Sequence, residues 1–476
     1  MNDQLTTYLR GIEQAIGAEL WYVGGCVRDE LIGIPCNDID LIALGLPQDE
    51  LNDALSKFGK VDVTGAVFGV TRFRPSDRSL PMLEISLPRK EISTGAGHKD
   101  FVVEFDHTLP LEDDLQRRDF TVNSFAKSVA TGEIRSVEGA SDDLDYNALR
   151  FISDTSAQDD PLRILRAVRF VSKLGFMPTT DTEKQLVDNV ELLANVSAER
   201  IQEELLKIVV GRYVDTALRF AQNIGVLRIL IPELETCVGV EQNHYHSLTV
   251  FEHIVEVVKH TPSTDPIVRL AALFHDIAKP PTKWTGDDGV NHFYHAEPGQ
   301  KFLVEPEIHG NHEDVGADIS RDIMNRLRFS SQNVDRVFAL VKNHMFIQGE
   351  NLRRPAARRL LARFAHVPGG LGENIDALFA IRTGDIYGGK VDKVNQAYLD
   401  LNDQFYKVVK KEIELETVFK VTDLAINGGD LINLGLTPGP HFSRILKGLL
   451  DDVIENPDLN DRDVLLDRVR NTVGVV

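Results

Sequence analysis

The sequence changes its hydrophobic period near residue 155, and this change limits the chain to a two-part architecture. Before that point, short apolar runs such as "IDLIAL" and "LEISL" alternate with turn residues, as strands of a mixed α/β region do. In "DDPLRILRAVRFVSKLGF", Leu162, Leu165 and Val168 recur every three residues, and Pro161 and Gly175 mark the two ends of a predicted helix. Helical spacing continues in most later segments. We therefore predict an α+β chain with a strand-containing N-terminal domain followed by mostly helical regions.

The length and texture indicate several domains. At about 150 residues per domain, 476 residues suggest about three, and the change in texture near residue 150 marks the end of the first. A hydrophobic fraction of 42% and a charged fraction of 26% are typical of a globular chain that can form a sizeable core. The predicted regions are 1–150, 151–243, 244–390 and 391–476.

Charge and cysteine content indicate a cytoplasmic protein. Cys26, Cys36 and Cys237 form no spaced framework, which fits reduced thiols. No signal peptide precedes the first domain, and no apolar run approaches the ~18 residues of a membrane span, so no membrane partner is expected. A net charge of −21 argues against nonspecific nucleic-acid binding by the whole surface, but it leaves room for a locally basic groove.

The segment "VGGCVRDELIGIPCNDIDLIAL" combines features that suit a nucleotide and a metal. On a strand, Asp38 and Asp40 would share a face about 7 Å apart. Two such carboxylates attract a hard cation such as Mg²⁺, which also accepts phosphate oxygens as ligands. Gly24 and Gly25 precede a predicted helix whose N-terminal amides favour phosphate, and Arg28 adds a positive charge. The structural alternative is a glycine turn with solvated acids at a strand end.

Two later segments add arginines. In "LEDDLQRRDFTVNSFA", Arg117 and Arg118 stand beside acids and ahead of a helix-like run, where they could neutralise phosphate charge or form an ordinary surface ion-pair cluster. In the next predicted helix, Asp160 is either an N-cap or a base-reading carboxylate. An Asp that accepts from an amino group, beside an Arg that donates to a ring nitrogen, selects cytosine and adenine over uracil and guanine. The arginines of this basic stripe are Arg163, Arg166 and Arg169.

A second constellation lies in the helical region. A His-Asp dipeptide on an apolar helical stripe needs a partner or a metal, because buried charge is costly. Imidazole and carboxylate ligands together suit a transition metal or a mixed divalent site that activates water. A lone histidine is more often a core or surface residue, but the ordered set favours a metal site. Its members are His253, His275, Asp276, His312, His344 and Asp385.

At this point the motifs resemble a known family over nearly the whole chain. The segments "GGCVRDELIGIPCNDIDL", "RKEISTGAGHKDF", "LEDDLQRRDFTVNSFA", "DDPLRILRAVRF", "AERIQEEL" and "DLAINGGDLINLGLTPGPHFSRIL" occur in family order. They resemble motifs of the class II tRNA nucleotidyltransferases, which are the CCA-adding enzymes, and of the related bacterial poly(A) polymerases. Mild departures are Asp159 for Glu, Ser124 for Ala and Ser443 for Gly.

The resemblance implies both an architecture and an activity. It implies a polymerase-β-like nucleotidyltransferase head, a helical neck and body with a nucleobase-reading helix, an HD-type domain and a C-terminal RNA-binding tail, in the four regions given above. It further implies Mg²⁺-dependent, template-independent addition of C, C and A from CTP and ATP to a tRNA 3′ end. The metal ligands would be Asp38 and Asp40, with Glu84 as a third catalytic carboxylate. The nucleotide-binding residues would be Gly24, Gly25, Arg28, Arg118, Asp160, Arg163, Arg166 and Arg169.

The histidine set resembles the HD phosphohydrolase domain. This implies a divalent transition metal such as Ni, Mn or Fe, and 2′,3′-cyclic phosphates or phosphomonoesters at RNA ends as substrates. Alternatives stay open: a poly(A) polymerase, a CC-only or A-only enzyme, an HD phosphohydrolase with a regulatory nucleotide-binding head, or a noncatalytic RNA-binding scaffold. The basic segment 353–364 is either an RNA contact or a solvated helix face, and the sequence leaves the oligomeric state open.

Overall fold

The computed structural model divides the chain into two compact units, each described by itself. The first unit comprises Met1–Arg200 with Asn223–Leu230, and the second comprises Ile201–Gln222 with Ile231–Val476. The division into four domains stays a prediction. The structure describes residues 3–36, 38–62, 70–93, 101–242, 247–285, 291–293, 311–346, 352–389, 395–415 and 418–473.

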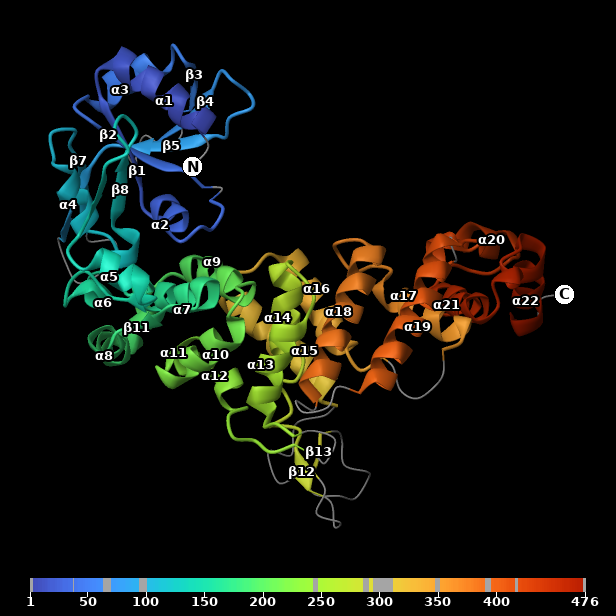
Figure 1. Ribbon diagram of the computed structural model, residues 1–476. Coiled ribbons are helices and arrows are strands. Elements are labelled where there is room, and N and C mark those ends of the chain that lie inside the picture. The colour runs from blue at the N-terminus through green and yellow to red at the C-terminus, as the bar shows by residue number, and fades with distance from the viewer. Residues whose placement is uncertain are drawn as a thin grey trace. The chain divides into compact units, whose positions relative to one another are not determined.

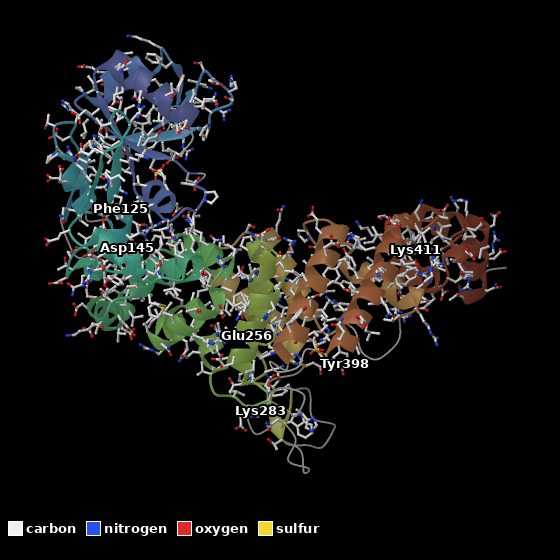
Figure 2. All side chains as sticks on the ribbon, in the orientation of Figure 1. Phe125, Asp145, Glu256, Lys283, Tyr398 and Lys411 are labelled. Carbon is white, nitrogen blue, oxygen red and sulfur yellow. The ribbon has the colours of Figure 1, made fainter. Side chains whose placement is uncertain are left out.

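A mixed seven-stranded sheet forms the centre of the first unit (Figure 1), in the order β3-β4-β5-β2-β1-β8-β9. Only β2 and β5 are parallel neighbours; the other neighbours in the sheet are antiparallel. Strand β1 places Leu20, Trp21, Tyr22 and Val23 in the core, and Phe125, which begins β8, is also buried (Figure 2). The strands are β1 (Glu19–Val23), β2 (Asp40–Leu44), β3 (Gly59–Asp62), β4 (Val70–Pro75), β5 (Leu83–Ser86), β8 (Phe125–Ser128) and β9 (Ile134–Ser136), with a separate pair β6 (Arg89–Ser93) and β7 (Phe101–Phe105).

Helices follow the sheet, as predicted from the change in period. Helix α7 buries Leu162, Leu165 and Val168 and ends at Gly175, whose φ of 74° suits a left-handed C-cap. The helices that lie wholly or mainly in the first unit are α1 (Asp3–Ile16), α2 (Gly25–Leu31), α3 (Gln48–Leu55), α4 (Leu111–Gln116), α5 (Ala140–Asp145), α6 (Ser156–Asp159), α7 (Leu162–Leu174), α8 (Thr180–Asn189) and α11 (Val226–Leu230), with 3-10 turns η2 (Thr121–Asn123) and η3 (Val190–Asn195) and the strand pair β10 (Ala148–Leu149) and β11 (Met177–Pro178).

The second unit is almost entirely helical in its described residues (Figure 1). The predicted α+β class is therefore confirmed. Helices α9 (Ala198–Val209) and α10 (Val214–Asn223) span the division between the units, and the others are α12 (Pro232–Glu235), α13 (Val250–His260), α14 (Pro266–Phe274), α15 (His312–Arg326), α16 (Ser331–Lys342), α17 (Arg354–Phe364), α18 (Leu371–Gly389), α19 (Gln396–Glu414), α20 (Gly428–Asn433), α21 (Pro440–Glu455) and α22 (Arg462–Val473), with 3-10 turns η4 (Val421–Asp423) and η5 (Pro457–Leu459) and the hairpin β12 (Trp284–Thr285) and β13 (Asn291–His292).

Two glycines let α18 approach α13 closely. A Cβ atom at Gly384 would lie 2.5 Å from Thr261 Oγ1, and one at Gly388 would lie 2.8 Å from Val257 Cγ2. Each distance is shorter than real Cβ contacts, so these positions need glycine for the observed packing. Among the described residues, no helix is both long and apolar enough to cross a membrane.

The basic segment 353–364 contains α17, and one of its five arginines is used inside the protein. The Arg358 guanidinium is buried and donates to the carbonyl oxygens of Ile454 and Glu455 at the end of α21, and also to Glu412 on α19. Arg354, which is exposed, pairs with the same Glu412 carboxylate. Arg358 therefore has a structural role in α17, and the solvated-face and RNA-contact interpretations stay predictions for the exposed arginines of the segment.

We expect Glu412→Gln to destabilise the second unit by about 3–5 kcal/mol, because it leaves the buried Arg358 charge without its partner. Urea unfolding followed by circular dichroism measures this loss. The matched control is Arg468→Gln, which removes an exposed pair with Asp452 and should cost no more than about 1 kcal/mol. Equal stability of the two variants would contradict this account of α17.

Candidate functional site

Three carboxylates meet where β2 and β5 lie in parallel. Asp40 is the first residue of β2, and its Cα partner on β5 is Glu84. Asp38 lies in the loop before β2, so the prediction that both aspartates stand on the strand was wrong. The strand begins only at Asp40, and Asp38 lies in the loop before it, from which its charge still acts on Asp40.

The charges of these carboxylates influence one another. Asp40 is exposed, but the surrounding protein restricts its hydration and thereby raises its pKa. The charge of Arg118 lowers this pKa, and the charges of Glu84 and Asp38 raise it. Glu84 also accepts a hydrogen bond from Arg72 Nε at 3.1 Å. Three acidic groups this close attract a cation, and an oxygen-only ligand set fits a hard ion such as Mg²⁺.

Gly24 and Arg118 are packed together beside these carboxylates. Helix α2 begins at Gly25, one residue earlier than the prediction that both glycines precede it, and Gly24 has a φ of 73°. A Cβ atom at Gly24 would lie 2.5 Å from Arg118 Nη1, so both the backbone angle and the space require glycine. Asp114, which is fully buried, holds Arg118 Nη2 at 3.0 Å. Arg118 Nε is buried and has no hydrogen-bond partner among the described residues.

Arg28 is placed differently from Arg118. It is buried, its guanidinium pairs with the Asp29 and Asn123 side chains, and it stacks 5.4 Å from the centre of the Phe170 ring. The carboxylate of Asp29 also accepts from Lys173 on α7. Arg28 therefore links α2 to α7.

The arginine pair follows a helix rather than preceding one. Helix α4 ends at Gln116, and the segment after the pair forms the 3-10 turn η2 and then strand β8, so the predicted helix-like run was wrong. The buried Asp114 accepts from Arg117 Nε at 2.8 Å as well as from Arg118, which draws both cations back toward α4.

The start of α7 brings the predicted base-reading residues together with one that was not predicted. Asp160 Oδ1 accepts from the Leu162 amide, although the N-cap itself is Pro161. Asp160 Oδ2 accepts from Arg200 Nη2 at 2.9 Å. Arg163 donates to the Arg117 carbonyl at 2.8 Å, so its guanidinium is fixed close to the arginine pair. Sequence reasoning missed Arg200, although it lies in the quoted segment "AERIQEEL".

The other two arginines of α7 have distinct surroundings. Arg166 Nε donates to the buried Asp119 at 2.8 Å. Burial alone would raise the pKa of Asp119, but the Arg166 charge and hydrogen bonds from Asn123 and the Phe120 amide lower it to about 2. Arg169 stacks 4.9 Å from the centre of the Phe170 ring.

The six predicted metal ligands of the second unit converge in the structure. His253 lies on α13, His312 begins α15, and Asp385 lies on α18. His275 and Asp276 follow the end of α14 at Phe274, so the prediction that they lie on the helix was wrong. His344 lies after the end of α16, and all four histidines are buried.

Asp276 stands at the centre of this cluster. Its Oδ2 atom lies 3.1 Å from His253 Nε2 and 3.2 Å from His275 Nε2. Its Oδ1 atom lies 3.4 Å from His312 Nε2 and 3.7 Å from His344 Nε2. The sets His253-His275-Asp276 and Asp276-His312-His344 each have the spacing to hold a metal ion. The carboxylate therefore divides the cluster into two subsites.

The outer nitrogens of all four histidines contact main-chain carbonyls. The Nδ1 atoms lie 2.7–3.1 Å from the oxygens of Gly388, Ala272, Phe293 and Val341, respectively, in the order of the sequence. A carbonyl accepts only, so each Nδ1 carries a proton and each neutral ring presents its Nε2 lone pair inward. Lone pairs that face carboxylate oxygens repel unless a cation lies between them, and this donor set fits divalent metals.

The pKa values of the histidines in the cluster are shifted in different directions. Burial lowers the pKa of His312 to about 3 and also lowers that of His275, which keeps both rings neutral. Burial alone would lower the pKa of His253, but contacts with Asp276 and Asp385 raise it to about 9. Without a metal, a proton on His253 can therefore neutralise part of the carboxylate charge.

Sequence profiles match four successive parts of the chain. The Poly A polymerase head domain matches residues 20–150, the RNA and SrmB-binding site of polymerase A matches 175–237, the HD domain matches 243–367, and tRNA nucleotidyltransferase domain 2 matches 383–469. Asp385 lies outside the HD match.

Named relatives agree with these profiles. The "Multifunctional CCA protein" of Vibrio vulnificus is 32% identical over 306 residues, which cover 60% of this chain and 69% of that protein. The chain belongs to the CCA-adding tRNA nucleotidyltransferase and poly(A) polymerase family. It spans only 65% of the length of the Xanthomonas campestris "Multifunctional CCA protein", with 32% identity over 287 residues and 56% of this chain covered. A "CC-adding tRNA nucleotidyltransferase" of Thermus thermophilus is 29% identical over 90% of this chain and 88% of its own length.

Solved structures of the family share the fold. The CCA-adding enzyme of Bacillus stearothermophilus, solved in complex with CTP, matches with a TM-score of 0.68 and 21% identity over 100% of both chains. The family's flexible-loop motif falls at residues 89–101 here, of which 94–100 lie outside the described residues.

We expect Asp119→Asn to lower stability by about 2 kcal/mol near neutral pH. The folded-state pKa of Asp119 is about 2, below its ordinary value of 3.8, so its contribution is present above pH 3.8 and lost as the pH falls through 2. The difference in unfolding free energy between wild type and variant should therefore shrink between pH 5 and pH 2. A difference that does not change with pH would contradict the ion pair with Arg166.

We expect Gly388→Ala to weaken metal binding in the second unit by about 10–100-fold, because the new methyl group would lie 3.2 Å from His253 Nδ1 and displace its contact with the Gly388 carbonyl. Titration with Mn²⁺ measures the affinity. Gly389→Ala is the matched control, since a Cβ atom there meets nothing within 4 Å. Equal affinities in the two variants would show that the close helix approach does not position His253.

Proposed function

We propose that the protein adds C, C and A to the 3′ end of tRNA, using CTP and ATP without a nucleic-acid template. One observation carries the proposal: the acidic edge formed by Asp38, Asp40 and Glu84 lies within electrostatic reach of Arg118, which packs on Gly24. This arrangement supports a nucleoside triphosphate held together with Mg²⁺. Membership of the CCA-adding family supports the same substrates.

In this proposal each side chain has a separate task. Asp38 and Asp40, with Glu84, hold Mg²⁺, and Arg118 donates from its unpartnered Nε to the triphosphate beside the amides at Gly24 and Gly25. When bound, Mg²⁺ supplies charge neutralisation as the RNA 3′-OH attacks the α-phosphorus and pyrophosphate leaves. Arg28, which is buried and paired, acts by fixing α2 rather than by contacting phosphate.

Asp160 and Arg163 read the base. Two oxygens of Asp160 already accept from Leu162 and Arg200, which fixes the carboxylate but leaves lone pairs for an amino group. Arg163, fixed by the Arg117 carbonyl, donates to the ring nitrogen. Arg200 is a positioning residue in this scheme, and Arg166 and Arg169 support the helix.

We propose that the second unit holds a divalent transition metal such as Ni, Mn or Fe at the ligand set of His253, His275, Asp276, His312, His344 and Asp385. A bound metal there supplies water activation for hydrolysis of phosphoesters at RNA ends. The central place of Asp276 between two pairs of histidines supports two metal positions that share this carboxylate.

Partial addition is the second candidate function, because the Thermus thermophilus relative, which aligns with 90% of this chain, is named for CC addition. The four-domain division and a cytoplasmic location are part of the proposal. A nucleotide-incorporation assay separates the candidates: a tRNA that ends at the discriminator base is incubated with Mg²⁺ and labelled CTP, ATP or both. Addition that stops at CCA supports the proposal, whereas CC alone, A alone, or a long A tail would each contradict it.

The matched substitutions Asp40→Asn and Asp53→Asn test whether addition depends on the acidic edge. Asp40→Asn should reduce incorporation by at least about a thousandfold, because it removes a charged ligand of the Mg²⁺ ion that assists nucleotidyl transfer. Asp53 is exposed on α3 of the same unit and is not among the charges that shift the pKa of Asp40, so its substitution should leave the rate unchanged. Incorporation by Asp40→Asn at the control's rate would overturn the proposed site.

The adjacent acids Asp159 and Asp160 offer a matched test of base selection. We expect Asp160→Asn to raise incorporation of UTP and GTP relative to CTP by about 10–100-fold, because an amide can donate to the carbonyl that the carboxylate rejects. Asp159→Asn should leave selection unchanged, since the exposed Asp159 carboxylate accepts from the Thr155 hydroxyl at 2.9 Å. Unchanged selection in Asp160→Asn, with both variants folded, would contradict base reading by Asp160.

A further inference from the structure

Two basic side chains flank the histidine cluster, and sequence reasoning did not assign either to it. Lys279 Nζ lies 2.5 Å from Asp276 Oδ2 and donates to Gln242 Oε1 at 2.7 Å. On the side of α18, Arg382 Nη1 pairs with Asp385 Oδ2, while the other oxygen of Asp385 lies 3.3 Å from His253 Nε2. Each cation therefore touches a carboxylate that faces the proposed metal ligands.

The formal charges of the cluster do not suit a metal alone. Lys279 and Arg382 already cancel the charges of Asp276 and Asp385, and the neutral histidines add none. One divalent ion would therefore leave two uncompensated positive charges in a buried site, of which Glu313, 3.3 Å from His312 Nδ1, offsets one, and a second ion would add two more. Buried charge without compensation is costly, so the metal-loaded cluster requires an anion.

The two cations are placed to receive that anion. Lys279 has only 8% of its side chain exposed and Arg382 has 18%, so both act where water is scarce and a charge-assisted hydrogen bond is strong. The Lys279 ammonium also lies 5.5 Å from the centre of the Phe293 ring, which shields it on one side. When a metal takes over part of the carboxylate charge, the N–H groups of both side chains can turn to a new acceptor.

We propose that Lys279 and Arg382 are phosphate-binding side chains of this site, which selects a doubly charged terminal phosphate over a singly charged phosphodiester. Arg382 presents a planar fork that matches two phosphate oxygens, and Lys279 supplies a point charge on the side of Asp276. The inference rests on the proposed metal site and adds the residues that hold the substrate and the charge class of that substrate.

The test uses the full-length protein at saturating Mn²⁺, with inorganic phosphate as the probe and isothermal titration calorimetry as the readout. We expect Arg382→Gln and Lys279→Gln each to bind phosphate about 10–100-fold more weakly than wild type. Arg321→Gln is the matched control. Arg321 forms an ion pair with Asp318, three positions earlier on the exposed face of α15, and Arg382 and Asp385 have the same spacing. Bound Mn²⁺ is counted by mass spectrometry in every sample.

Several outcomes decide the inference. Phosphate affinities of Arg382→Gln and Lys279→Gln within twofold of the control, with Mn²⁺ retained, would overturn it. Arg382→Lys keeps the charge and should recover part of the affinity; no recovery would assign the loss to packing and also overturn the inference. Wild type that binds neither Mn²⁺ nor phosphate would overturn both this inference and the metal site.

A hydrolysis assay on the same samples separates this inference from the proposed function. Loss of phosphate binding in the variants, with no hydrolysis of p-nitrophenyl phosphate by wild type, would end the hydrolase proposal and leave the phosphate site standing. Wild-type hydrolysis should favour p-nitrophenyl phosphate over its bis ester, and Arg382→Gln should reduce that preference. An unchanged preference would contradict the selection of a doubly charged phosphate.

Discussion

The proposed nucleotide site depends on the contacts that fix α7 against the elements that carry the proposed triphosphate-binding residues. Three polar contacts do this along the length of the helix: Arg163 with the Arg117 carbonyl, Arg166 with Asp119, and Lys173 with Asp29. Because both ends of one rigid helix are held, the base-reading side chains keep a fixed distance from the acidic edge of the sheet. A triphosphate and its base are joined covalently, so a site for both must hold this distance.

Both candidate sites use carboxylates that serve a ligand and a neighbouring cation together. In the first unit, Asp114 forms ion pairs with Arg117 and Arg118. In the second unit, Asp276 contacts four imidazoles and Lys279. In water such ion pairs would contribute little, but burial makes each of them directional and strong. The acidic net charge of the chain is therefore compatible with anionic substrates, since the cations that matter are local and fixed in place.

The sequence predicted the fold class and most of the site because both leave short-range patterns. The period of apolar residues predicted α7 with its ends, and the order of the histidines predicted a cluster that the structure brings together. Helix ends were harder to predict: α14 ends at Phe274 although the backbone angles of His275 are still helical, and the apolar period gives no signal for that end. For the same reason, periodicity could not place Asp38 outside β2.

Partners that lie far apart in the sequence were the main omission. Arg200 and Asp160 are forty positions apart, and only the fold shows that one holds the other. The same is true of Gly388, whose need for glycine comes from α13 rather than from a turn. Lys279 and Arg382 each lie three residues from a predicted metal ligand, but their importance comes from the charges that surround them, which the fold alone assembles.

A crystal structure of the protein with CTP and Mg²⁺ would test the central claim most directly, since that claim is one of position. The account predicts the triphosphate beside Gly24 and Arg118, Mg²⁺ on Asp38 and Asp40, and the cytosine amino group on Asp160 with N3 on Arg163. A nucleotide bound away from the acidic edge, or a base that contacts neither Asp160 nor Arg163, would contradict it.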